Sequence, residues 1–167
     1  MTLNQDLMNA VRTLSNAGCH YRLDELAGCY EPDLQIFIVQ PDGNVLSFDY
    51  EQNMAFFRER RDAGAPPINT SIHFNIAEVQ GGTGFVTATR RMDLGYGTGE
   101  QEIVFTLMLR IGNDGKWRVF REHAVITSAS SAAISSGRAS SSRCSLYDSL
   151  AVRLGLGLSF SDGLSVI

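Results

Sequence analysis

The strongest constraint on this chain is a change of pattern near residue 68. Beyond that point apolar and polar side chains alternate repeatedly, most regularly over residues 103–109. Alternation of this kind is typical of half-buried strands. Turn sequences interrupt it at Gln80–Thr83 and at Asn113–Gly115, and both have the composition of hairpin turns. The segment 68–127 therefore predicts a four-stranded antiparallel meander.

The first part of the chain has a different periodicity. Apolar residues recur at helical spacing, and the pattern predicts helices over 5–17, 22–29 and 50–63. Two β-rich runs, 34–39 and 45–47, predict a short strand pair between the last two of these helices. Helices followed by strands indicate the α+β class, here a curved antiparallel sheet with the helices on one face.

Local signals place the ends of these helices. Asn4 can cap the first helix, and Gly18 is the expected left-handed residue at its end. Asp49 and Gln52 have the spacing of a capping box at the start of the third helix. Pro32 prevents the second helix from continuing.

Composition excludes several classes of function. The 167 residues include 14 basic and 18 acidic side chains, a net charge of −4, which argues against a nucleic-acid partner. No apolar run is long enough to span a membrane, and the polar start does not resemble a secretory signal. Three cysteines without a CxxC pair indicate neither a disulfide framework nor a zinc site, so we expect a cytoplasmic protein.

The last 40 residues differ from the rest. After Thr127 the chain is rich in Ser, Ala and Gly, and it holds too few large apolar residues to bury a core of its own. We expect one folded domain over 1–127, followed by a Ser-rich linker and C-terminal tail over 128–167.

Three stretches resemble a known family: Leu14–Gly18, Leu23–Asp33 and Gly115–His123. They are similar to the nuclear-transport-factor-2-like (NTF2-like) superfamily, in its SnoaL-like branch, over about residues 5–127. The resemblance implies a cone-shaped α+β barrel of the cystatin-like type, whose curved sheet wraps the N-terminal helices and encloses a pocket. It also implies a homodimer formed through the outer face of the sheet. Members include isomerases, cyclases, dehydratases, hydrolases, kinase association domains and binding proteins, so the fold alone does not determine the function.

The resemblance to ketosteroid isomerases can be followed to single positions. Their oxyanion-stabilising tyrosine falls near Val11, and their carboxylate base falls near Ile38. Neither side chain can donate or accept a proton, which argues against isomerase chemistry by that apparatus.

Three side chains are candidates for acid–base chemistry. His123 is the first, because an unperturbed imidazole titrates near neutral pH, and the matching position in SnoaL-like proteins often carries a polar pocket residue. His73 and the Tyr50 hydroxyl are further candidates. Each also has a plain structural interpretation, as a surface or interface histidine or as an aromatic residue at a helix start. On alternation, Glu122 lies on the opposite face from His123, so the two cannot share one pocket.

The expected ligand is a small apolar molecule. We expect its pocket to be lined by Ile36, Ile38, Phe57 and Phe74, with Arg121 available to bind a ligand carboxylate. No metal and no cofactor are expected, because no ligand cluster or cofactor motif is present. Three functions stay open: an enzyme with His123 as its acid–base group, a binding module without chemistry, and an oligomerisation domain.

Overall fold

The computed structural model describes residues 3–93 and 99–127, and the prediction of a linker and tail over 128–167 lies outside the described residues. The order of elements confirms the α+β class. It runs α1 (Gln5–Cys19), α2 (Leu23–Ala27), β1 (Tyr30–Val39), β2 (Val45–Asp49), α3 (Tyr50–Asp62), β3 (His73–Gln80), β4 (Thr83–Met92), β5 (Gln101–Ile111) and β6 (Trp117–Thr127).

The six described strands form one sheet in the order β2-β1-β6-β5-β4-β3. Strands β3 to β6 pair antiparallel in sequence order, so the predicted meander is confirmed. The sheet is not antiparallel throughout, because β1 runs parallel to β6. That pairing joins strands far apart in the chain, and no local pattern in the sequence encodes its direction.

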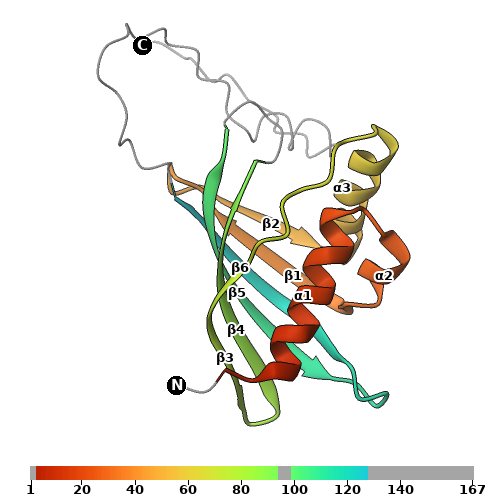
Figure 1. The fold of residues 1–167 in the computed structure, drawn as a ribbon, viewed down its shortest axis with the longest axis vertical. Helices are drawn as coiled ribbons and strands as arrows, with labels where there is room; N and C mark the ends of the chain where they lie inside the picture. Colours follow the sequence, from red (N-terminus) through yellow and green to blue (C-terminus); the bar gives the residue numbers. More distant parts are fainter. Residues whose placement is uncertain (1–2, 94–98, 128–167) are drawn as a thin grey trace, which may run out of the picture. The chain divides into compact units, whose positions relative to one another are not determined.

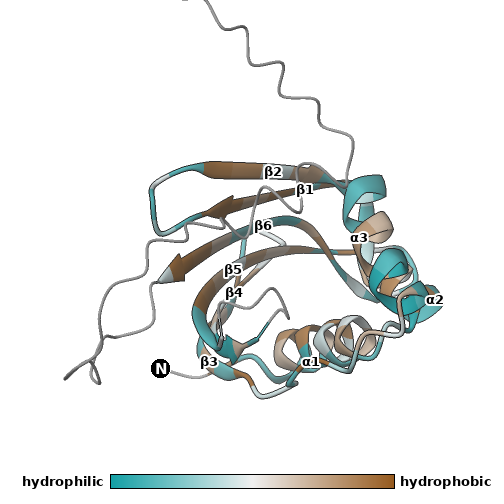
Figure 2. Ribbon diagram, turned by 90° about the horizontal axis from the view of Figure 1, so that it is seen from above, coloured by the Kyte–Doolittle hydropathy of each residue, from teal (hydrophilic) through white to brown (hydrophobic). Residues whose placement is uncertain are grey.

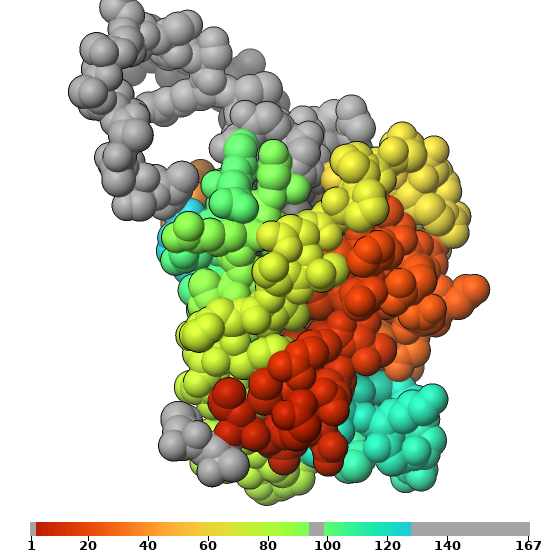
Figure 3. All heavy atoms as spheres, in the orientation of Figure 1, coloured from red at the N-terminus to blue at the C-terminus, as the bar shows by residue number. Residues whose placement is uncertain are grey.

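The sheet is strongly curved and unclosed, and the helices lie on its concave side (Figures 1 and 2). Helix α1 runs across this side, and the segment after α3 lies next to it (Figure 3), where the Ile68 N–H donates to the Cys19 carbonyl at 3.0 Å. The largest side chains that are almost fully buried lie between these layers: Leu7, Leu26, Leu34, Val86, Leu109 and Val119. We call the concave side the inner face and the convex side the outer face.

Helix α1 begins as expected, and its end shows a correction. The Asn4 side chain accepts a hydrogen bond from the Leu7 N–H at 3.1 Å, which is the predicted cap. The predicted left-handed glycine is wrong: Gly18 lies inside the helix, and Tyr21 has the positive φ, at 56°. Gly18 allows close packing instead, since a Cβ there would lie 3.3 Å from the Phe57 ring.

The capping box of α3 is present. The Asp49 carboxylate accepts from the Gln52 N–H at 2.9 Å, and the Gln52 side chain accepts from the Asp49 N–H at 3.0 Å. These bonds satisfy backbone donors that the first helical turn leaves without partners.

This cap makes a measurable contribution. We expect Asp49→Ala to lower the free energy of unfolding by about 1 kcal/mol, because the first turn of α3 loses its side-chain acceptor. Asp49→Asn is the matched control and should stay close to the wild type, because asparagine caps equally well. Urea unfolding of the full chain measures both. Equal midpoints for Asp49→Ala and the wild type would contradict the assignment.

Two β-bulges change which side chains face inward. In β3 the register shifts between Phe74 and Ile76, so Phe74 pairs with the buried Ala88 whereas Ile76 lies on the outer face. Strict alternation would place Phe74 and Ile76 on one face, and the bulge separates them. A bulge adds one unpaired residue, and strict alternation counted from the sequence fails beyond it.

The bulge in β6 has the larger consequence. Leu109 pairs with Val119 and Met108 pairs with Arg121, so Phe120 is the extra residue. Val119, which strict alternation groups with His123, therefore shares the inner face with Glu122. Val119 and Ala124, the inner residues on either side of Glu122, are 0% and 2% exposed.

Candidate functional site

Glu122 places a carboxylate on the inner face of the sheet. It pairs with Leu107 of β5 on one side and with Ile36 of β1 on the other, and each of these residues is 4% exposed. Glu122 itself is half-buried. Its side chain therefore keeps some accessible surface although its strand neighbours are packed.

The surroundings of Glu122 change its acidity. Removal of the carboxylate from water is the main cause that raises its pKa from 4.5 to about 7, and the positive charge of Arg90 offsets only part of this effect. Within residues 3–93 and 99–127, no hydrogen bond or ion pair holds the carboxylate. Both the protonated and the ionised form are then populated near neutral pH, as a general acid or base requires.

Tyr30 and Asn53 supply polar groups near this carboxylate. Tyr30, at the start of β1, is 5% exposed, and burial followed by the charge of Glu122 raises its pKa above the ordinary range. The Tyr30 hydroxyl thus keeps its proton and stays a hydrogen-bond donor. Asn53, on the buried side of α3, is 9% exposed. It lies close enough to lower the pKa of Tyr30, yet the geometry of a hydrogen bond is not met and Asn53 Nδ2 has no partner.

Arg90 of β4 is held away from Glu122. Its Nη2 donates to Cys19 Sγ at 3.0 Å and to the Asn69 carbonyl, which fixes the guanidinium against α1 and the segment before β3. Its Nε is buried without a hydrogen-bond partner. The inner face therefore carries one carboxyl group with a pKa of about 7. It also carries the buried donors Asn53 Nδ2 and Arg90 Nε, which have no hydrogen-bond partner.

The histidines predicted for chemistry lie elsewhere. His123 is exposed on the outer face, where its ring meets Phe37 edge to face at a centroid distance of 5.5 Å. His73 is the exposed first residue of β3. The structure thus separates both histidines from Glu122, and their role in chemistry stays a prediction.

The other predicted site residues divide between the two faces. Ile36 and Ile38 face inward on β1, Phe74 faces inward on β3, and Phe57 packs from α3 against Gly18. Arg121 lies on the outer side, where its Nη1 donates to the Asp33 and Phe120 carbonyls at 2.8 and 2.6 Å. Arg121 thus lies apart from Glu122, and its role in binding a ligand carboxylate stays a prediction.

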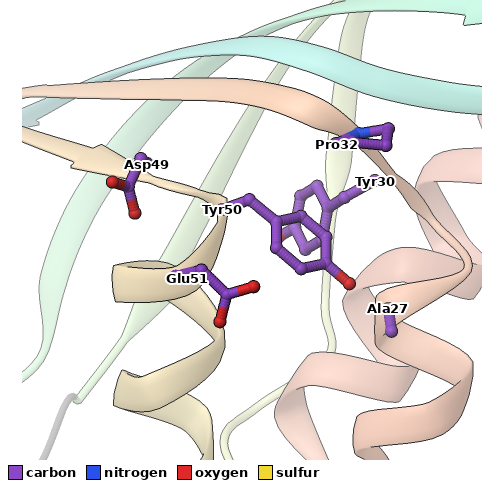
Figure 4. A pocket seen from close by; sticks show the side chains of 6 residues that line it. All are labelled: Ala27, Tyr30, Pro32, Asp49, Tyr50 and Glu51. Atoms are coloured by element: carbon purple, nitrogen blue, oxygen red, sulfur yellow. The ribbon is translucent and has the colours of Figure 1, made fainter.

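Tyr50 lines a separate pocket of about 440 Å³ next to the start of α3 (Figure 4). Tyr30 forms part of the same pocket, so this pocket adjoins the inner face. The role of Tyr50 in a reaction stays a prediction.

Sequence reasoning set aside the residues that the inner face brings together. Glu122 was visible as the one acid within an apolar strand, and Asn53 as an amide on the buried side of a helix. A polar residue in a periodic apolar position is the signal that could have found both. Tyr30 carried no such signal, since a buried tyrosine is usual in a core.

The structure reports on two further expectations. None of the described helices is long and apolar enough to cross a membrane. Among the residues described, no group of three or more His, Cys, Asp or Glu side chains is placed to hold a metal ion.

The outer face carries a row of four valines across four strands, formed by Val45, Val39, Val125 and Val104. Of these, Val45 and Val125 are 56% and 43% exposed. The homodimer expected through this face stays a prediction.

Comparison with known proteins relates this geometry to a fold. No family model and no curated protein matches the sequence. Solved structures do match. One is a candidate dehydratase of the NTF2-like family from Streptomyces avermitilis, with 23% identity and a TM-score of 0.57, covering 75% of this chain and 96% of that one.

Two others extend the comparison. An NTF2-like protein from Cytophaga hutchinsonii has 15% identity and a TM-score of 0.58, over 74% of this chain and 99% of that one. A ketosteroid isomerase-like protein from Erwinia carotovora has 10% identity and a TM-score of 0.53, over 74% and 95%. The chain therefore has the NTF2-like fold. At these identities the likeness defines the fold and leaves the activity to be argued from the site.

Proposed function

We propose that this protein is an enzyme that transfers a proton within a small, mostly apolar substrate, with Glu122 as the acid–base group. The observation that carries the proposal is the position of Glu122, a carboxyl group on the inner face that lacks a fixed partner in the described chain and has a pKa near 7. A partner that neutralised it permanently would prevent such a role. Its surroundings instead leave both protonation states available.

The neighbouring donors indicate the class of reaction. A base that removes a proton next to a carbonyl group needs donors for the oxygen on which negative charge develops. Asn53 Nδ2 is a buried donor without a partner, and the Tyr30 hydroxyl lies close enough for the charge of Glu122 to raise its pKa. Isomerisation of a ketone and elimination of water from a β-hydroxy ketone both use this set.

The rest of the inner face supports an apolar substrate. Ile36, Leu107 and Ala124 lie around the Glu122 position on three strands, and each is at most 4% exposed. Apolar walls with a few polar groups are typical of small-molecule sites. The names of solved neighbours, which include a candidate dehydratase and a ketosteroid isomerase-like protein, are compatible with either reaction.

Two adjacent residues test the proposal. We expect Glu122→Gln to lower turnover by about 100-fold or more, because the acid–base group is lost and the shape is kept. His123→Ala is the matched control and should retain turnover, since this side chain lies on the other face. The assay incubates the full chain with cyclic ketones and β-hydroxy ketones in D₂O, and follows deuterium uptake and loss of water by NMR.

The outcomes separate the alternatives. Turnover lost in His123→Ala and kept in Glu122→Gln would contradict the proposal and return the reaction to the outer face. Binding of these ketones without turnover in the wild type would instead identify a binding module.

A further inference from the structure

The pocket beside Glu51 has features that the proposed reaction does not use. It lies between α2, the first residues of β1 and the start of α3 (Figure 4), and its volume is about 440 Å³. Six residues line it: Ala27, Tyr30, Pro32, Asp49, Tyr50 and Glu51. Two are acidic, two are aromatic, and none is basic.

The acidic and hydroxyl groups of the pocket are available to a ligand. Asp49 Oδ1 accepts from the Gln52 N–H, and this bond holds the carboxylate at the pocket while Oδ2 has no partner in residues 3–93 and 99–127. Over the same ranges, the Glu51 carboxylate and the Tyr50 hydroxyl form no hydrogen bond or ion pair. Figure 4 shows that the Glu51 side chain extends from α3 toward the Tyr50 ring.

Tyr30 adds a hydroxyl group to this lining. The residue is 5% exposed and lines the pocket, and the Asn53 side chain lies close enough to affect its pKa. A ligand in the pocket can form a hydrogen bond with this hydroxyl group.

We propose that this pocket binds an organic ammonium ion. Two carboxylates with no basic residue in the lining favour a positive charge, and the rings of Tyr30 and Tyr50 attract cations through their faces. Ala27 and Pro32 provide apolar surface for the carbon part of the ligand. The positive end of α3 does not oppose this charge strongly, because the Asp49 carboxylate and Gln52 already cap it.

A bare metal ion fits this pocket poorly. Asp49 and Glu51 are its only carboxylates, and no group of three or more metal-ligating side chains occurs in the described part of the chain. The rings and apolar residues would leave such an ion partly without ligands. An ammonium group attached to an apolar body uses the whole lining. The carboxylates of this site differ from the one used in the proposed reaction, and Tyr30 belongs to both sites.

The probe is phenethylammonium, and 2-phenylethanol is its neutral counterpart of similar size. We expect the ammonium ion, added to the full chain at low salt, to shift the backbone amide signals of Ala27, Tyr30, Tyr50 and Glu51 in NMR spectra. The affinity for the alcohol should be lower by about tenfold or more, since the alcohol lacks the charge. Equal affinities, or shifts confined to other regions, would overturn the proposal.

Variants locate the site. The double variant Asp49→Asn with Glu51→Gln keeps the cap and the shape, and we expect it to weaken binding of phenethylammonium about tenfold. Glu59→Gln with Glu78→Gln removes the same charge from exposed positions outside the pocket and should bind as the wild type does. Unchanged affinity in the pocket variant, or an equal loss in the control, would overturn the proposal.

Discussion

Replacing Glu122 by glutamine is expected to make the protein more stable at pH 8, by up to about 3 kcal/mol, and to change its stability little at pH 4. The reason is the pKa of about 7 that burial imposes on this carboxyl group in the folded chain, compared with 4.5 for an ordinary glutamate. Ionised Glu122 is retained at a cost in free energy, and glutamine removes that cost.

The direction of the pH dependence follows from proton binding. Between pH 4.5 and 7 the folded chain holds a proton on Glu122 that the unfolded chain has released, so the contribution to stability falls as the pH rises. Below this window both states are protonated, and above it the full cost is present. The difference between wild type and variant should therefore grow through this window and then level off.

Urea unfolding from pH 4 to pH 8 measures this difference. Glu78→Gln is the control, because Glu78 is an exposed glutamate of β3 and its replacement should not change the pH dependence. A wild-type chain as stable as Glu122→Gln at pH 8 would show that the carboxylate is solvated or paired, and the argument for its catalytic role would lose its basis.

Replacing Leu7 by alanine is expected to lower the free energy of unfolding by about 2–5 kcal/mol. Leu7 is 0% exposed and joins α1 to the sheet at Gly84. A Cβ built at Gly84 would lie 2.5 Å from Leu7 Cδ2 and 3.3 Å from the Trp117 ring. The contact leaves no room for a larger residue, so Gly84→Ala alone should also destabilise the chain, by about 1–3 kcal/mol.

The two substitutions should not be additive. Once Leu7 is shortened, the methyl group of Gly84→Ala enters the space that it leaves, and the double variant should be more stable than the sum of the single effects predicts. Leu26→Ala is the control, since Leu26 is also 0% exposed but is not among the atoms that approach Gly84. Additive effects for Leu7 and Gly84 would contradict this packing.

Local chemistry made much of the fold predictable. The caps at Asn4 and Asp49 act within one helical turn, and the structure contains both. The alternation over residues 103–109 is confirmed in β5, where Ile103, Leu107 and Leu109 are at most 4% exposed. Such signals depend on residues that are neighbours in the chain, so they can be recognised without knowing the tertiary structure.

The candidate site was less predictable for a definite reason. Strand β6 carries apolar side chains on both faces, so hydropathy does not distinguish the inner from the outer face. The bulge at Phe120 then breaks the alternation that would link Trp117 and Val119 to His123. The choice between Glu122 and His123 consequently depended on a register that only the pairing with β5 and β1 defines.

The sequence by itself determined the elements, the N-terminal caps of two helices and the α+β class, because these depend on interactions between residues a few positions apart. Only the tertiary structure decided that β1 lies parallel to β6, that Glu122 faces the helices and that His123 does not. Those features depend on contacts between distant segments and on one inserted residue in a strand. They convert an unremarkable glutamate into a carboxyl group with a pKa near 7.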